Sequence, residues 1–275
     1  MTMNYPVSII IRTKNRPKLL RRALVSLRRQ SFTDFEVNIV EDGKPHSRSI
    51  CDEFSDLSIQ YYSTNEQVGR ARAANIGMDL SSGYYLNFLD DDDFLLPNHI
   101  ETMLKKFEEK NEADVVYGRS IERKDNFVTE KLDDSFCDSG RVRNFGELDK
   151  QKIFFQNYFP IQAVMFKKEL YECYGGMDES LKYLEDWDLW IKYSMVAVFC
   201  YTDEITSVYH VPNKRNERKE RERILKNYEC VIKEKYKQKR IVLNIKQPNL
   251  IDKIVGKIKR EGIRGLILDI FNKIT

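Results

Sequence analysis

Several signatures that assign a function on their own are missing from this chain of 275 residues. Its five cysteines are scattered and form no Cys-X-X-Cys pair, which predicts reduced thiols in a cytoplasmic protein and no zinc site. No GxxxxGK(S/T) loop is present, and no GxGxxG follows the first apolar run, which excludes P-loop and Rossmann nucleotide sites. No signal peptide and no apolar run of about 18 residues occurs, so we expect a protein that is soluble or lies on a membrane surface.

The composition is that of a globular protein. Hydrophobic residues make up 41% of the chain and charged residues 32%, which fits one large α/β domain with an appendage. A net charge of only +3 gives the whole protein no strong attraction for polyanions, so nucleic acid is not an expected partner.

Apolar strands alternate with amphipathic helices through the first half of the chain. The expected strands are at 7–11, 35–40, 59–62, 84–89 and 115–118. The expected helices between them are at 17–27, 47–54, 65–77 and 97–110. This alternation predicts an α/β fold with a mostly parallel central sheet, right-handed crossovers and flanking helices.

The second half is less regular. Residues 120–150 are polar and weakly periodic, which predicts a long loop of the kind that often forms binding segments. The strands expected beyond it are short, at 196–201 and 205–209. Because residues 214–240 have the spacing of an amphipathic helix, we divide the chain into an α/β domain at 1–212 and a helical extension at 213–275.

Four consecutive aspartates, Asp90 to Asp93, directly follow the strand at 84–89 and are expected on a short strand-to-helix loop. Adjacent carboxylates repel one another, and oxygen ligands suit Mg²⁺ or Mn²⁺, with substrate phosphates completing the coordination. Ligands of open α/β sheets bind outside the carboxyl ends of strands, where this loop would lie. A solvated acidic turn is the alternative. An EF-hand is excluded, because Leu95 stands where its loop needs glycine.

Two further acidic segments are candidates for the same site. Asp42 follows the strand at 35–40, where it would accept hydrogen bonds from a base or ribose, or simply form a turn before glycine. Asp186 lies in the run Glu185-Asp186-Trp187 at the start of a predicted helix. Burial beside tryptophan would raise the pKa of such a carboxylate into the range of a general base, whereas stabilisation of the helix dipole is the alternative.

Two basic groups also belong to the candidate site. Arg70, near the start of the helix at 65–77, would face a diphosphate, although arginines on helices are more often solvated. His210 directly follows the strand at 205–209 and would reach the metal ion, and a purely structural histidine is the alternative.

In their order along the chain, these segments resemble the motifs of family 2 of the GT-A glycosyltransferases. The matching segments are Val7–Arg16, Val40–Gly43, Asn65–Gly77, Phe88–Asp93, Gly175–Glu179 and Glu185–Trp190. The resemblance covers roughly residues 6 to 210. It departs from the family's commonest second motif, Asp-Asp-Gly-Ser, at Glu41 and Lys44.

The resemblance implies a GT-A fold and inverting transfer of a sugar from a nucleoside diphosphate, expected to be UDP, to a glycan or lipid-linked acceptor in cell-surface polysaccharide synthesis. It implies these roles: Asp186 as catalytic base, Thr13, Asp42, Arg70, Asp90 and Asp91 at the donor, and Asp92 with His210 at Mn²⁺ or Mg²⁺. A metal-dependent nucleotidyltransferase stays open as an alternative, although its glycine-rich, lysine-containing phosphate loop is missing. A binding module that acts through the basic C-terminal region is the other alternative.

The last segment has the character of a membrane-surface helix from about residue 249. From Lys246 onward there are seven basic and three acidic residues, a net charge of +4 beside an apolar face that includes Phe271. This predicts attraction to an anionic membrane surface, which would place the protein at the inner face of the plasma membrane. Packing on the α/β domain or on a second copy in a homodimer is the alternative.

Overall fold

The computed structural model describes residues 5–125 and 140–242. The strands are β1 (Val7–Thr13), β2 (Phe35–Glu41), β3 (Ser58–Ser63), β4 (Tyr85–Asp90), β5 (Phe94–Leu95), β6 (Val115–Asp125), β7 (Arg141–Arg143), β8 (Val164–Lys167) and β9 (Phe199–Pro212). The α-helices are α1 (Pro17–Arg28), α2 (Arg48–Cys51), α3 (Arg70–Leu80), α4 (His99–Glu109), α5 (Lys168–Tyr174), α6 (Glu185–Ser194), α7 (Arg215–Lys235) and α8 (Lys237–Val242).

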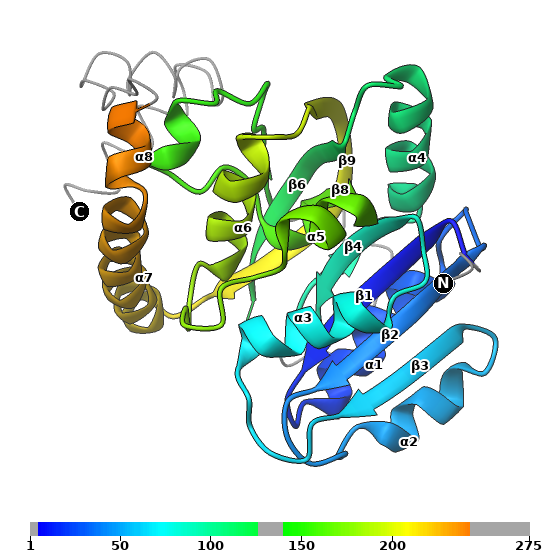
Figure 1. Ribbon diagram of the computed structural model, residues 1–275. Coiled ribbons are helices and arrows are strands. Elements are labelled where there is room, and N and C mark those ends of the chain that lie inside the picture. Colours follow the sequence, from blue (N-terminus) through cyan, green and yellow to red (C-terminus); the bar gives the residue numbers. More distant parts are fainter. Residues whose placement is uncertain (1–4, 126–139, 243–275) are drawn as a thin grey trace.

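The strands form one nine-stranded sheet in the order β3-β2-β1-β4-β8-β6-β9-β5, with β7 paired to β6 (Figure 1). The neighbouring strands β3, β2, β1 and β4 are all parallel. Along the chain a helix connects each of these strands to the next, as parallel pairing requires. Register places Thr13 beside Glu41 and Arg12 beside Asp90, so the carboxyl ends of these strands meet at one edge. The predicted α/β class is confirmed, and the second half adds an antiparallel strand, β8, between β4 and β6.

Helices cover both faces of the sheet. Alternate residues of β1 show the two faces: Ile10 packs in one buried cluster with α3 and α6, whereas Ile9 and Ile11 pack in another with α1 and α4. Ile232 of α7 is fully buried in the first cluster, so this helix packs on the α/β body. The proposed division near residue 212 stays a prediction, and the segment from 243 lies outside the described residues.

Two local expectations were wrong, and strand pairing explains each one. The loop expected at 120–150 begins as strand, because β6 continues along β9 and also pairs with β7; residues 126–139 of it lie outside the described residues. The two short strands expected at 196–201 and 205–209 are the single strand β9, with register shifts that absorb the polar residues between them. The helix expected at 97–110 is confirmed as α4, and the two-residue strand β5, which pairs with β9, lies between it and the aspartates.

No helix in the described ranges is long and apolar enough to cross a membrane. The four cysteines that the structure describes are all free thiols.

Gly83, which lies just before β4, is held against the backbone of β1. A Cβ atom added there would lie 2.6 Å from the nitrogen of Ser8 and 2.7 Å from the carbonyl carbon of Val7. We therefore expect Gly83→Ala to lower the free energy of unfolding by about 1–3 kcal/mol, measured by urea denaturation. Ser82→Ala is the matched control, because the Ser82 hydroxyl has no hydrogen-bond partner among the described residues. Equal stability of the two variants would contradict this close packing.

Candidate active site

The acid quartet lies where the buried strand β4 ends, as the sequence predicts. Asp90 is the last residue of β4, and Asp91 to Asp93 lead from it into β5. Carboxylate oxygens of Asp90, Asp92 and Asp93 all lie within 4.8 Å of one another, and we call these three residues the acid cluster. The loop is held from α1, because Arg22 Nη2 donates a hydrogen bond to the Asp92 carbonyl at 2.6 Å.

The negative charges of this loop are incompletely compensated. Burial, and then the charges of Asp92 and Asp90, hold the pKa of Asp93 well above its ordinary value. Burial raises the pKa of Asp91 to about 7, with Arg16 opposing the shift and Asp92 adding to it. Ionising these groups therefore costs free energy that a divalent cation would offset. Three oxygen ligands within reach of one ion fit Mn²⁺ or Mg²⁺.

The residues predicted to line the nucleoside are linked to one another. Thr13, which ends β1, donates its hydroxyl to Asp91 Oδ2 at 2.7 Å, and its carbonyl accepts the Asp42 N–H at 2.8 Å. The Asp42 carboxylate accepts the backbone N–H of Val68 at 2.6 Å and that of Gly69 at 3.1 Å. Asp42 therefore fastens the loop that precedes α3, and its contact with a base stays a prediction.

Arg70 begins α3 directly after this loop and lies between two carboxylates. Its Nη2 is 3.1 Å from Asp90 Oδ2, and its Nε is 3.1 Å from Glu185 Oε1. Burial opposes its positive charge, but Glu185, Asp90 and two further aspartates, Asp186 and Asp92, raise its pKa. The side chain is still 46% exposed, so it can reach an anionic ligand in front of the acid cluster.

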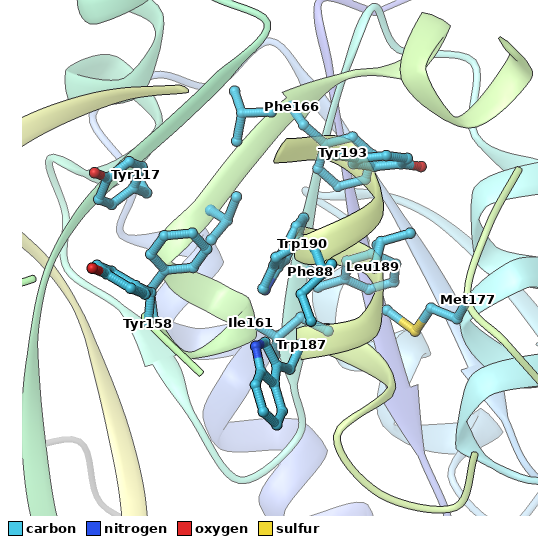
Figure 2. Close-up of a cluster of buried hydrophobic side chains, with 14 of the residues drawn as sticks. Phe88, Tyr117, Tyr158, Ile161, Phe166, Met177, Trp187, Leu189, Trp190 and Tyr193 are labelled. Atoms are coloured by element: carbon cyan, nitrogen blue, oxygen red, sulfur yellow. The ribbon is translucent and has the colours of Figure 1, made fainter. Parts of the chain in front are cut away.

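Asp186, the predicted catalytic base, lies in the first turn of α6. Aromatic packing fixes this helix, because Trp187 and Trp190 are fully buried in the same cluster as Phe88 of β4 (Figure 2). Trp187 also donates its indole N–H to the Ile153 carbonyl at 2.6 Å. The position of Asp186 therefore depends on the core of the domain.

The electrostatic surroundings of Asp186 suit a general base. Burial raises the pKa of its carboxyl to about 6, and the negative charge of Glu185 adds to the shift. Asn157 Nδ2 donates to Asp186 Oδ2 at 3.3 Å. Leu184, just before the helix, has a left-handed backbone with φ 61°, a strained conformation that is frequent at functional sites. Glu185 is almost fully buried between arginines, which leaves Asp186 as the more accessible of the two carboxylates.

His210 lies next to the acid cluster, although within β9 and not after a strand end. Its backbone N–H donates to Asp93 Oδ1 at 2.9 Å, and its ring Nδ1 is 3.6 Å from the same oxygen. The ring is buried, with its centroid 5.4 Å from that of Phe94. Its predicted role as a metal ligand is compatible with this place but stays a prediction.

Three residues of the site were missed by sequence reasoning. Arg16 lies 2.5 Å from Asp91 Oδ1 and 3.3 Å from Asp92 Oδ2, and Arg12 also contacts the acid quartet. Asp93 belongs to the quartet, but no role was assigned to it. A sequence signal for Arg12 and Arg16 was present. The apolar run of β1 changes to charged residues at its end, just as the apolar run of β4 changes to the aspartates.

A comparison with protein families identifies the class to which this fold and site belong. The model of glycosyl transferase family 2 matches residues 8–175, which is more than half of the chain. The chain therefore belongs to glycosyltransferase family 2. An uncharacterised glycosyltransferase of Rickettsia prowazekii is 28% identical over 207 residues, covering 72% of this chain and 62% of the relative. The chain thus spans about three fifths of the length of such relatives.

Solved structures show the same fold. The S. aureus protein TarS in complex with UDP-GlcNAc superimposes with a TM-score of 0.59 at 18% identity, covering 79% of this chain and 60% of TarS. The mannosyltransferase PcManGT of Pyrobaculum calidifontis, in complex with GDP-Man and Mn²⁺, also gives 0.59 at 18% identity, with coverages of 77% and 59%. These similarities confirm the predicted GT-A fold.

Proposed function

We propose that the protein is a metal-dependent, inverting glycosyltransferase that uses a nucleoside-diphosphate sugar, with UDP as the expected nucleotide. One observation carries this proposal. Arg70 is paired both with Asp90 of the acid cluster and with Glu185, the neighbour of the candidate base. A diphosphate next to Arg70 would therefore lie between a metal site and a general base, which is the arrangement that sugar transfer requires.

Asp90, Asp92 and Asp93 would hold Mn²⁺ or Mg²⁺, with His210 beside them, and the bound ion would supply charge neutralisation for the leaving diphosphate. Arg70 adds a positive charge on the side of α3. Among the relatives, PcManGT in complex with GDP-Man and Mn²⁺ supports a divalent ion of this kind.

The chemical step follows from the place of Asp186. An acceptor hydroxyl oxygen attacks the anomeric carbon, a new C–O bond forms, and the bond from that carbon to the diphosphate oxygen breaks. Asp186 takes the hydroxyl proton, and its pKa of about 6 keeps it ionised and ready at neutral pH. A single displacement inverts the anomeric centre and needs no covalent intermediate.

Thr13, Asp42 and Asp91 lie at the same sheet edge and are proposed to line the nucleoside. The complex of TarS with UDP-GlcNAc supports a uridine nucleotide, and that of PcManGT supports a guanosine nucleotide as the alternative. The proposed acceptor is a glycan or lipid-linked hydroxyl in polysaccharide synthesis, as the resemblance implies.

The test is a screen of nucleotide sugars for release of the nucleoside diphosphate. UDP-N-acetylglucosamine, UDP-glucose, UDP-galactose and GDP-mannose are each incubated with Mn²⁺, Mg²⁺ or EDTA. We expect slow release from one UDP-sugar that EDTA abolishes. Formation of pyrophosphate from a nucleoside triphosphate and a sugar phosphate, without hydrolysis of any nucleotide sugar, would instead support the nucleotidyltransferase alternative.

The C-terminal segment adds a proposal about location, which rests on sequence because residues 243–275 lie outside the described residues. Anionic lipid should attract this segment by about 1 kcal/mol per basic residue near the surface. We expect the full chain to float with anionic liposomes at low salt, and a chain that ends at Gln247 to stay at the bottom of the gradient. Equal recovery of both chains, or binding that ignores lipid charge and salt, would favour packing within the protein.

A further inference from the structure

Two arginines and two carboxylates form a closed network that includes Asp90 of the acid cluster, and the proposed mechanism gives no role to one of its members, Arg12. Arg12 contacts Asp90 Oδ1 through Nη2 at 2.6 Å and through Nε at 3.0 Å. It contacts Glu185 Oε1 through Nη1 at 2.8 Å. Arg70 reaches the same two carboxylates from α3, so each carboxylate lies between two guanidinium groups.

The two arginines differ in how firmly they are held. Arg12 is a residue of β1 that pairs with strands on both sides, and its side chain is only 6% exposed. Its guanidinium also lies over the Phe88 ring, at 5.7 Å from the centroid, and 3.9 Å from Met177 Sδ. Arg70, by contrast, is 46% exposed. When an anion arrives, Arg70 is therefore the one that can leave the network.

The network also sets the electrostatic surroundings of Asp186. The charged groups with the largest effect on this carboxyl come from three elements: Glu185 of its own helix, Arg70 of α3 and Arg12 of β1. After burial, the charge of Glu185 raises the pKa of Asp186, whereas both arginines lower it. If Arg70 turns to a ligand, Arg12 is the member that still balances Glu185.

We propose that Arg12 is a positioning residue that holds Asp90 and Glu185 together, so that Asp186 stays in place while Arg70 turns from the network to the diphosphate of the donor. The inference rests on the proposed function, because it assumes a donor diphosphate and a base at Asp186. Removing Arg12 leaves two carboxylates that share Arg70, which then becomes less available to the donor. A lysine at position 12 keeps the charge, but a single ammonium lacks the planar fork that spans two carboxylates.

The test compares Arg12→Lys with Arg12→Met, and Arg21→Met is the matched control because Arg21 pairs with Glu53 on the exposed surface of α1. For Arg12→Lys we expect an affinity for UDP with Mn²⁺ within about twofold of wild type, and a kcat of nucleotide-sugar turnover about 100-fold lower, as for a displaced catalytic group. For Arg12→Met we expect both quantities to fall. Adding Glu185→Gln to Arg12→Met should restore UDP affinity, because Arg70 is released from one carboxylate.

A second readout needs no donor. The carboxyl-carbon NMR signal of Asp186, assigned with Asp186→Asn, reports its titration. The midpoint should rise above about 6 in Arg12→Met and fall in Glu185→Gln, because the arginine lowers this pKa and the glutamate raises it. Arg21→Met should leave it unchanged.

The outcomes separate the two proposals. An unchanged midpoint in Arg12→Met overturns the role of Arg12, even in a protein that turns over no nucleotide sugar. Wild-type kcat in Arg12→Lys also overturns it, as does an equal loss of UDP affinity in Arg12→Lys and Arg12→Met without rescue by Glu185→Gln. Shifted midpoints in a protein that neither binds UDP nor releases it support the network and count against the proposed function alone.

Discussion

Replacing Asp186 with asparagine is expected to lower the rate of sugar transfer by about 10²–10⁴-fold, the usual contribution of a positioned general base. Asparagine has nearly the same shape but cannot accept the proton of the acceptor hydroxyl. Affinity for UDP with Mn²⁺ should stay close to wild type, because no described contact joins Asp186 to the acid cluster. Initial rates at saturating donor and calorimetry with UDP measure the two quantities, and melting temperature checks the fold.

The pH dependence provides an independent check on the same residue. Because Asp186 must be ionised to act, and its pKa is raised to about 6, the wild-type rate should fall as the pH is lowered through 6 and be retained above it. The low residual rate of Asp186→Asn should lack this dependence. Near-wild-type turnover in Asp186→Asn would contradict the assignment and leave Glu185 as the rival base.

The sequence predicts the parallel half of this fold well, and the reason is local. Strand β1 and residues Leu86–Leu89 of β4 are buried on both faces, so they appear as continuous apolar runs that end abruptly at charged residues. The ends of those runs also mark the site, since Asp42 follows β2 and the acid quartet begins with the last residue of β4. Burial of the carboxylate in the segment Glu185–Trp187 was also predictable, and it is the largest cause of the raised pKa of Asp186.

What could not be predicted depends on pairing between distant residues. β5 is only two residues long and exists because β9 offers it a partner. β7 and the outer part of β6 are polar segments whose strand conformation comes from pairing, β7 with β6 and β6 with both β7 and β9. Arg12 and Glu185 are separated by 173 positions in sequence, so nothing local shows that they form an ion pair. The sequence therefore predicted the candidate base and most of the acidic residues of the site, but neither Arg12 and Arg16 nor which charges compensate one another.

Replacing Asp92 with asparagine is expected to abolish the part of UDP affinity that depends on Mn²⁺, a loss of more than about 100-fold if a direct ligand is removed. An amide oxygen is a weaker ligand than a carboxylate for a hard cation. The fold should be retained, because the charge of Asp92 raises the pKa of both Asp93 and Asp91, and its removal relieves this repulsion.

Calorimetry with UDP in the presence of Mn²⁺ or EDTA measures this effect on the Asp92→Asn variant. Asp56→Asn is the matched control, because Asp56 is an exposed aspartate that pairs with Arg28 and does not belong to the acid cluster. In wild type and in the control, EDTA should weaken UDP binding strongly, whereas in Asp92→Asn it should change little, because the dependence on metal is already lost. The raised pKa of Asp93 adds a second signature: wild-type binding of Mn²⁺ should release protons, so its apparent affinity should increase with pH. Equal, Mn²⁺-dependent UDP affinity in Asp92→Asn and in wild type would show that the acid cluster does not bind the metal through Asp92, and the proposed metal site would then be withdrawn.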